Sequence, residues 1–180
     1  GDGEDLLNWV LSAYETDKTI PLPALVVFGP FITRSNRKHF LERIAKLDNV
    51  DAIMFDAKIE HLMKKATAIV AMGGYNTFCE ILSLDKPALI VPRKRPRLEQ
   101  AIRASCAERL GLVHQLDGLD SPGGTHDPAE MAQAIRGLQD QRKPSEAFVP
   151  GLLDGLSRIQ EMTKPWLDAA RRSQQLPPSV

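Results

Sequence analysis

The sequence predicts an α/β fold in which helices cover both faces of a parallel sheet. Three observations indicate this fold: short apolar runs alternate with longer amphipathic stretches, the runs are continuous rather than alternating, and Gly or Pro follows several of them. Continuous apolar runs are typical of strands buried on both faces, and strand–helix alternation indicates right-handed crossovers. With 180 residues, the chain is long enough to bury such a core.

The predicted elements follow one another along the chain. The apolar runs predict strands at residues 25–28, 52–55, 68–72, 88–91 and, more weakly, 112–116. Apolar residues at helical spacing predict helices around 6–14, 40–44, 59–66, 78–82, 98–110, 131–138 and 152–171. We expect Ser35 or Asn36 to cap the second helix, Asn76 or Thr77 to begin the fourth, and Gly111 to end the fifth. Trp9 and Trp166 are expected to be packing residues.

The domain organisation follows from the same pattern. We expect one ligand-binding domain at residues 1–150, a C-terminal helix at 151–171 and a loose tail at 172–180. The first predicted helix has no strand before it, although this fold normally opens with a strand, a Gly-rich turn and a helix. Gly1-Asp2-Gly3 is typical of the end of such a turn. We therefore expect the first strand to be missing and the sequence to begin inside a larger fold.

Charge and composition exclude several function classes. The 23 Lys and Arg balance 23 Asp and Glu, which argues against a general nucleic-acid binder. No apolar run is long enough to span a bilayer, and no signal peptide is visible. Cys79 and Cys106 form no C-x-x-C pair and the four His have no H-x-x-x-H spacing, so no metal site is expected. Such cysteines are usually reduced and structural, which favours a cytoplasmic location.

The best candidate site follows the third predicted strand, because ligands of open parallel sheets bind beyond the carboxyl ends of the strands. The segment 73–77 reads Gly-Gly-Tyr-Asn-Thr. Its glycines permit a tight turn and a close approach to a ligand, and the helix that follows presents free N–H groups suited to a phosphate. Asn76 and Thr77 add short side-chain donors. The alternative is an ordinary strand–helix turn in which Asn76 or Thr77 caps the helix.

Further candidates lie near this segment. Glu80 can accept hydrogen bonds from a ribose diol, or it can simply favour the positive end of its helix. The basic segment 93–97, beginning at Arg93, can clamp a diphosphate, or it can be a solvated loop. Glu99 and Gln100 begin the next helix and can bind sugar hydroxyls, or they can complement the helix N-terminus. Each of these residues therefore has both a functional and a purely structural interpretation.

Taken together, these segments resemble a known family. Residues 68–82, 86–92, Glu99-Gln100 with Ala104, and Leu110-Gly111 follow one another in the order found in the C-terminal domain of glycosyltransferase family 28. The family's prototype is the bacterial N-acetylglucosaminyltransferase that completes the lipid-linked peptidoglycan precursor. The Met-Gly-Gly-Tyr-Asn-Thr variant is closer to a branch of predicted glycosyltransferases of bacterial type. With weaker matches on both sides, the resemblance covers roughly residues 1–140.

The resemblance implies a fold and a binding site. It implies a Rossmann-like doubly wound domain that forms the C-terminal lobe of a two-lobed GT-B fold and binds a nucleotide-sugar donor, with a UDP-sugar favoured. The donor-binding positions that it implies are Gly3, Asp56, Gly73, Gly74, Asn76, Thr77, Glu80, Arg93, Glu99 and Gln100. Glu80 would hold the ribose, the segment around Gly73 would lie near the diphosphate, and Glu99 and Gln100 would contact the sugar. The sequence departs from the prototype at Glu99, where Gln is usual, and at Arg103, where Asn is common.

The resemblance also implies a reaction. It is an inverting, metal-independent transfer of a hexosyl group to an unknown acceptor, with no cofactor, and this lobe would be inactive alone. The catalytic base is unknown and would belong to an N-terminal lobe in cis, through which any peripheral membrane contact would occur. The alternatives are a lobe of a nucleotide-sugar epimerase, for which no second acidic pair is visible, and a noncatalytic nucleotide-sugar-binding partner module.

Overall fold

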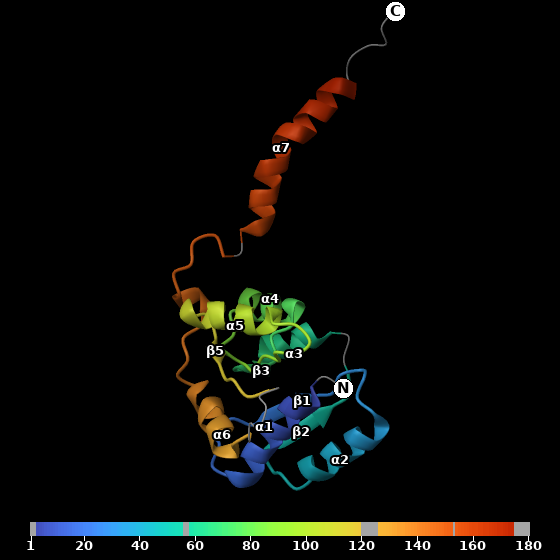
Figure 1. The fold of residues 1–180 in the computed structure, drawn as a ribbon, viewed down its shortest axis with the longest axis vertical. Helices are drawn as coiled ribbons and strands as arrows, with labels where there is room; N and C mark the ends of the chain where they lie inside the picture. Colours follow the sequence, from blue (N-terminus) through green and yellow to red (C-terminus); the bar gives the residue numbers. More distant parts are fainter. Residues whose placement is uncertain (1–2, 56–57, 120–125, 153, 175–180) are drawn as a thin grey trace, which may run out of the picture. The chain divides into compact units, whose positions relative to one another are not determined.

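The computed structural model describes residues 3–55, 58–119, 126–152 and 154–174. Strands and helices alternate through residues 1–147, which form one compact unit, and residues 148–180 form a second (Figure 1). The elements are α1 (Glu4–Thr16), β1 (Ala24–Val27), α2 (Arg34–Ile44), β2 (Val50–Ile53), α3 (Ile59–Lys65), β3 (Ile69–Ala71), α4 (Tyr75–Ser83), β4 (Ala88–Ile90), α5 (Glu99–Arg109), β5 (His114–Gln115), α6 (Pro128–Gly137), a 3-10 turn (Pro144–Glu146) and α7 (Gly155–Gln174).

All described strand pairs are parallel, as the sequence predicts, but the strands form two sheets. β1 pairs with β2, and β3, β4 and β5 form a second sheet in that order. β4 is buried along its whole length, whereas β1 and β3 are only partly buried. The fold is thus the predicted α/β class, with an interruption between β1 and β3.

The core is centred on α1, which packs against α6. Trp9 of α1 is buried, its indole Nε1 donates to the carbonyl oxygen of Asp127 at 2.7 Å, and its ring stacks on His126 with 4.9 Å between centroids. A Cβ atom at Gly118 would lie 2.6 Å from the Trp9 ring, so glycine is required there. The expectation that Trp9 is a packing residue is therefore confirmed.

Two local predictions are wrong by a few residues. β2 lies at Val50–Ile53, two residues before the predicted strand, and Met54 and Phe55 are exposed. Thr33 caps α2, accepting a hydrogen bond from the Asn36 backbone at 3.2 Å, in place of Ser35 or Asn36. Its extended backbone, with φ −68° and ψ 154°, is what an N-cap requires. Gly111 follows α5 with φ 71°, as predicted.

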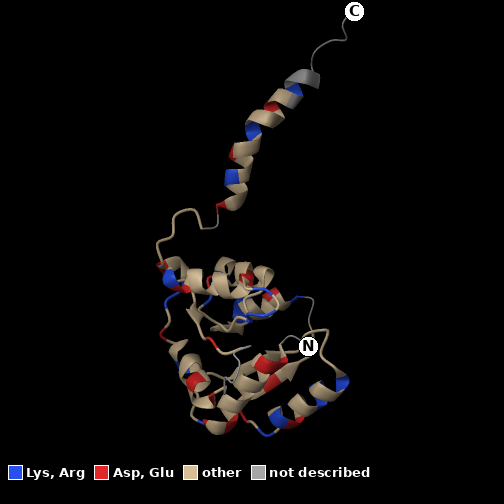
Figure 2. Ribbon diagram, viewed as in Figure 1, with Lys and Arg blue, Asp and Glu red and all other residues tan. Residues whose placement is uncertain are grey.

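The second unit contains α7. Its long apolar side chains are exposed, and Lys or Arg residues are interspersed with Asp and Glu along it (Figure 2). Trp166 is 79% exposed, so the expectation that it packs is wrong, because α7 leaves its apolar side chains uncovered. Among the described residues, no helix has both the length and the apolar character needed to cross a membrane.

A polar cluster links α6 to the turn after α1, and it generates a prediction about pH. The Arg136 guanidinium donates to the Asp17 carboxylate, and it also donates to the Thr19 carbonyl at 2.9 Å. Hydrogen bonding by Arg136 and then by Thr19 lowers the pKa of Asp17 from 3.8 to about 2. Because folding lowers this pKa, the stabilising contribution is present above pH 3.8 and is lost as the pH falls towards 2.

We therefore expect Asp17→Asn to lower the melting temperature at pH 7, and the difference from the unsubstituted chain to shrink between pH 4 and pH 2. Thermal unfolding followed by circular dichroism across this range measures it. Asp48→Asn, at an exposed position, serves as the matched control. A difference between Asp17→Asn and the unsubstituted chain that stayed constant with pH would contradict the assignment.

Candidate functional site

The candidate site lies at the carboxyl edge of the β3–β4 pair. The Val91 backbone N–H donates to the Ala71 carbonyl at 2.9 Å, so the chain leaves both strands side by side. Segment 73–77 follows β3 and the basic segment 93–97 follows β4. The structure therefore brings together two of the segments that the sequence analysis selected.

Gly73 and Gly74 are adjacent, but different constraints act on them. Gly73 is buried with φ 76°, a conformation that favours glycine, and a Cβ atom there would lie only 2.8 Å from Ile90 Cγ2. Gly74 has φ −53° and ψ 151°, and a Cβ atom there would meet no atom within 4 Å. The fold itself therefore requires glycine at position 73 and leaves open space beside position 74.

The N-terminus of α4 is free of internal caps. Gly74 occupies the N-cap position with no side-chain cap, and the first helical hydrogen bond runs from the Phe78 N–H to the Gly74 carbonyl at 2.8 Å. The N–H groups of Tyr75, Asn76 and Thr77 donate to no other described residue. Asn76 and Thr77, predicted to begin the helix, instead lie in its first turn. Three free N–H groups at the positive end of a helix are suited to an anion.

Glu80 lies farther along α4. Its side chain is half-buried and forms no hydrogen bond or ion pair with another described residue. Its carboxylate oxygens are therefore available as hydrogen-bond acceptors in the structure. Thr77, half-buried one turn earlier, and Asn76, exposed, also have side chains without a protein partner in the described part of the chain.

The first turn of α5 carries Glu99 and Gln100. Glu99 is exposed, whereas Gln100 is only 8% exposed and its Oε1 has no hydrogen-bond partner among the described residues. Leaving a buried acceptor without a donor costs about 1–3 kcal/mol. Gln100 thus has an unsatisfied oxygen at the beginning of a helix that also has no side-chain cap.

Arg103 of α5 contacts segment 73–77, a contact that the sequence analysis missed. Its Nη1 donates to the Gly73 carbonyl at 2.8 Å, and its guanidinium carbon lies 5.5 Å from the Tyr75 ring centroid and 5.9 Å from that of Phe78. The contact ties the loop after β3 to α5 through a hydrogen bond from a charged donor. Only the pairing of one Arg with nearby aromatic residues could have suggested it from sequence.

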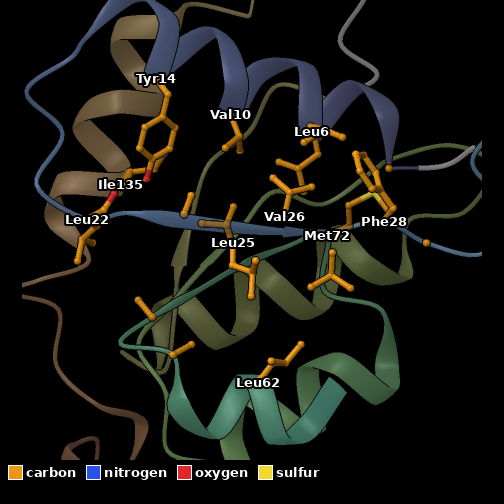
Figure 3. A pocket seen from close by; sticks show the side chains of 18 of the residues that line it. Leu6, Val10, Tyr14, Leu22, Leu25, Val26, Phe28, Leu62, Met72 and Ile135 are labelled. Atoms are coloured by element: carbon orange, nitrogen blue, oxygen red, sulfur yellow. Dashed lines mark hydrogen bonds between the residues drawn. The ribbon is translucent and has the colours of Figure 1, made fainter. Parts of the chain in front are cut away.

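The remaining candidates lie in other segments of the chain. Arg93 is half-buried next to the carboxyl end of β4, and the neighbouring Lys94 pairs with Asp117 at 3.1 Å. Gly3 lies at the start of α1 and lines, together with Met72, the apolar cavity shown in Figure 3. Asp56 lies outside the described residues. No cluster of three or more His, Cys, Asp or Glu side chains that could hold a metal occurs in the described part of the chain.

Comparison with known proteins agrees with this geometry. The family described as the glycosyltransferase family 28 C-terminal domain matches residues 4–105, more than half of the chain. The chain belongs to this family. No curated protein matches the sequence. The matched range contains segment 73–77, Glu80, Arg93, Glu99 and Gln100, and this family 28 domain is the donor-binding lobe of a glycosyltransferase.

The two glycines generate a paired prediction. Gly73→Ala should destabilise the domain by roughly 1–3 kcal/mol, because alanine is strained at positive φ and its Cβ would clash with Ile90. Gly74→Ala should leave stability unchanged or slightly raised, because its backbone conformation suits alanine and the space is open. Urea unfolding of both variants measures the difference, and equal stabilities would contradict this account of Gly73.

A second prediction concerns Arg103. Arg103→Met keeps much of the apolar stem but removes the charged donor to the Gly73 carbonyl, so we expect a loss of about 1–3 kcal/mol in unfolding free energy. Arg109→Met on the same helix is the control, because Arg109 is exposed and, within the described part of the chain, its side chain forms a hydrogen bond only with Cys106 of its own helix. If both variants unfold at the same urea concentration, the Arg103 bridge is not stabilising.

Proposed function

We propose that the N-terminus of α4 binds the diphosphate of a nucleotide-sugar donor, with a UDP-sugar favoured. The observation that carries the proposal is that the N–H groups of Tyr75, Asn76 and Thr77 donate to no other described residue and lie next to open space at Gly74. A diphosphate oxygen can approach the backbone closely there, because Gly74 has no side chain and the helix dipole favours negative charge. Asn76 and Thr77 supply additional donors.

In this proposal, different polar side chains contact different parts of the donor. Glu80 accepts hydrogen bonds from the ribose hydroxyls, while Glu99 and Gln100 contact the transferred sugar. The unsatisfied Oε1 of Gln100 supports this role, because a sugar hydroxyl would satisfy it. Arg93, at the same edge of the sheet, adds positive charge near the diphosphate. Gly3, at the start of α1, and Asp56, which lies outside the described residues, are the remaining positions of the proposed donor site.

We propose that the reaction is an inverting, metal-independent hexosyl transfer. The acceptor hydroxyl oxygen attacks the anomeric carbon, the bond to the diphosphate oxygen breaks, and the nucleoside diphosphate leaves with the electron pair. The free N–H groups of α4 would stabilise the charge that develops on the leaving group. A base must take the acceptor proton, and we assign both base and acceptor site to an N-terminal lobe in cis. We also propose a cytoplasmic location.

Binding measurements with matched variants test the donor site. The chain is titrated calorimetrically with UDP, GDP, dTDP, their sugars and uridine, and we expect the diphosphates to bind and uridine to bind far more weakly. Glu80→Gln should weaken UDP binding about 10- to 100-fold, since charged hydrogen bonds contribute about 1.5–3 kcal/mol. Glu42→Gln, at an exposed position of α2, is the control. UDP affinity unchanged by Glu80→Gln would refute the ribose assignment.

Gly74 provides an independent check of the diphosphate assignment. A Cβ atom there would have no atom of a described residue within 4 Å, so Gly74→Val should fold normally but place a side chain where the phosphate is proposed to lie. We expect UDP binding to fall at least tenfold while the melting temperature stays within a few degrees of that of the unsubstituted chain. UDP affinity retained by a folded Gly74→Val variant would place the diphosphate elsewhere.

A further inference from the structure

The large apolar side chains of α7 lie on one side of the helix and are exposed. Leu156 is 84% exposed and Met162 is 73% exposed, so little of the described chain covers them. Because successive residues of a helix are rotated by ~100° about its axis, the five large apolar residues fall within an arc of about 140°. We call this arc the apolar face of α7, and it consists of Leu156, Ile159, Met162, Trp166 and Leu167. A continuous exposed apolar arc of this width marks an interaction surface.

The charged residues of α7 are segregated by sign around the helix axis. Arg158 lies beside one border of the apolar face, while Lys164 and Arg171 lie beside the other, each within about 60° of the outermost apolar residue. Glu161 and Asp168 lie on the side of the helix nearly opposite the centre of the apolar face. Figure 2 shows that both signs occur along the length of α7. The cations therefore border the apolar face, and the carboxylates lie away from it.

A second α7 helix is a poor match for this face. A coiled-coil seam needs apolar residues at alternating spacings of three and four, and the seam through Ile159 and Trp166 has Thr163 between them. The Thr163 hydroxyl already donates to the Ile159 carbonyl at 2.8 Å. Met162 and Leu167, both large and exposed, would lie outside the seam. The apolar face is therefore wider than a coiled-coil seam and is better suited to an extended apolar surface.

The chemistry of α7 matches the surface of a bilayer that contains anionic lipids. A helix with one apolar face, a charged opposite face and an aromatic residue on the apolar side lies in the plane of such a surface. Trp166 suits the headgroup region, because its ring is apolar and its indole N–H can still donate to water or phosphate. Arg158, Lys164 and Arg171 have apolar stems that can lie along the border while their charged ends reach lipid phosphates. The two carboxylates on the far side stay in water, away from the negative headgroups.

The positions of these charges also indicate how the helix lies. α7 has 20 residues and is about 30 Å long at 1.5 Å per residue. Glu161, Lys164 and Asp168 occupy its middle third, so a helix that crossed the bilayer would place all three in the hydrocarbon at a high cost. A helix that lies along the surface keeps them in water and buries only the apolar face.

We propose that α7 binds the surface of a membrane that contains anionic phospholipids. Its apolar face enters the boundary between headgroups and acyl chains, and the bordering cations contact lipid phosphates. The sequence analysis assigned any peripheral membrane contact to an N-terminal lobe, whereas α7 supplies such a surface within this chain. The proposal concerns only residues 148–180, which form a separate unit, so it does not depend on the donor site. Titration with UDP tests the donor site separately.

Tryptophan fluorescence of the 180-residue chain tests the proposal. The chain has two tryptophans, of which Trp9 is 1% exposed and Trp166 is exposed, so a change in emission on binding reports Trp166. We expect vesicles of equal parts phosphatidylcholine and phosphatidylglycerol to shift the emission to shorter wavelength, and lipids with brominated acyl chains to quench it. Vesicles of pure phosphatidylcholine should bind at least tenfold more weakly, since each bordering cation contributes about fivefold on an anionic surface. High salt should weaken binding to the anionic vesicles.

Two variants with matched controls separate the apolar contribution from the charge contribution, with binding measured by co-sedimentation with vesicles. Trp166→Ser should weaken binding to anionic vesicles at least tenfold, whereas Phe31→Ser, at an exposed aromatic residue of the first unit, should not.

The second variant combines Arg158→Gln, Lys164→Gln and Arg171→Gln and should lose most of the preference for anionic over neutral vesicles. Its control removes the same charge from three exposed positions of the first unit, namely Lys18, Arg34 and Lys46. Because α7 lies outside the first unit, its substitutions should leave the melting temperature of that unit unchanged.

Several results would overturn the proposal. The absence of vesicle binding by the folded chain would refute it outright, and equal binding to neutral and anionic vesicles would refute the contact with lipid phosphates. A shift in Trp166 emission that depends on protein concentration without lipid, together with a dimer in sedimentation, would assign the apolar face to a second copy. Vesicle binding unchanged by Trp166→Ser and by the triple variant would place the membrane contact outside α7.

Discussion

The arrangement of the candidate site depends on the close pairing of β3 with β4. Ile90 occupies the space where a side chain at position 73 would lie, so the chain must turn at a glycine with positive φ. That turn makes Gly74 the N-cap of α4, and the next three N–H groups donate to no residue in the described ranges. Arg103 then holds the Gly73 carbonyl from α5. The loop is consequently fixed by the protein core before any ligand binds, which reduces the cost of ordering it on binding.

Much of the fold was predictable because it depends on patterns that are local in the sequence. Continuous apolar runs indicated the parallel strands, and the glycines after the third run indicated the turn. The predicted bounds of β2 are wrong because an apolar residue is not always a buried one. Met54 and Phe55 are apolar but exposed, and β2 lies two residues earlier than predicted. The beginning of α4 was placed too late because the positive φ of Gly73 turns the chain before Asn76.

The site was predictable as a set of positions but not as a set of contacts. The spacing of Gly73, Glu80 and Gln100 identified the segments, yet only three-dimensional packing shows that the Gln100 oxygen is buried without a donor. Arg103 is 30 residues from Gly73, and no local pattern reports a contact over that separation. The interruption between β1 and β3 is likewise visible only in space, because no local pattern in the sequence shows which strands pair.

The adjacent glycines also have a consequence for how this sequence can change over time. At position 73, selection for a folded domain alone is enough to retain glycine, because the constraint comes from Ile90 and the backbone. At position 74 the protein imposes no such constraint, so under the proposed function only ligand binding would preserve the residue. A descendant that abandoned its ligand would keep the first glycine and lose the second. Retention of glycine at position 73 together with its loss at position 74 would therefore indicate that ligand binding was lost while the fold was kept.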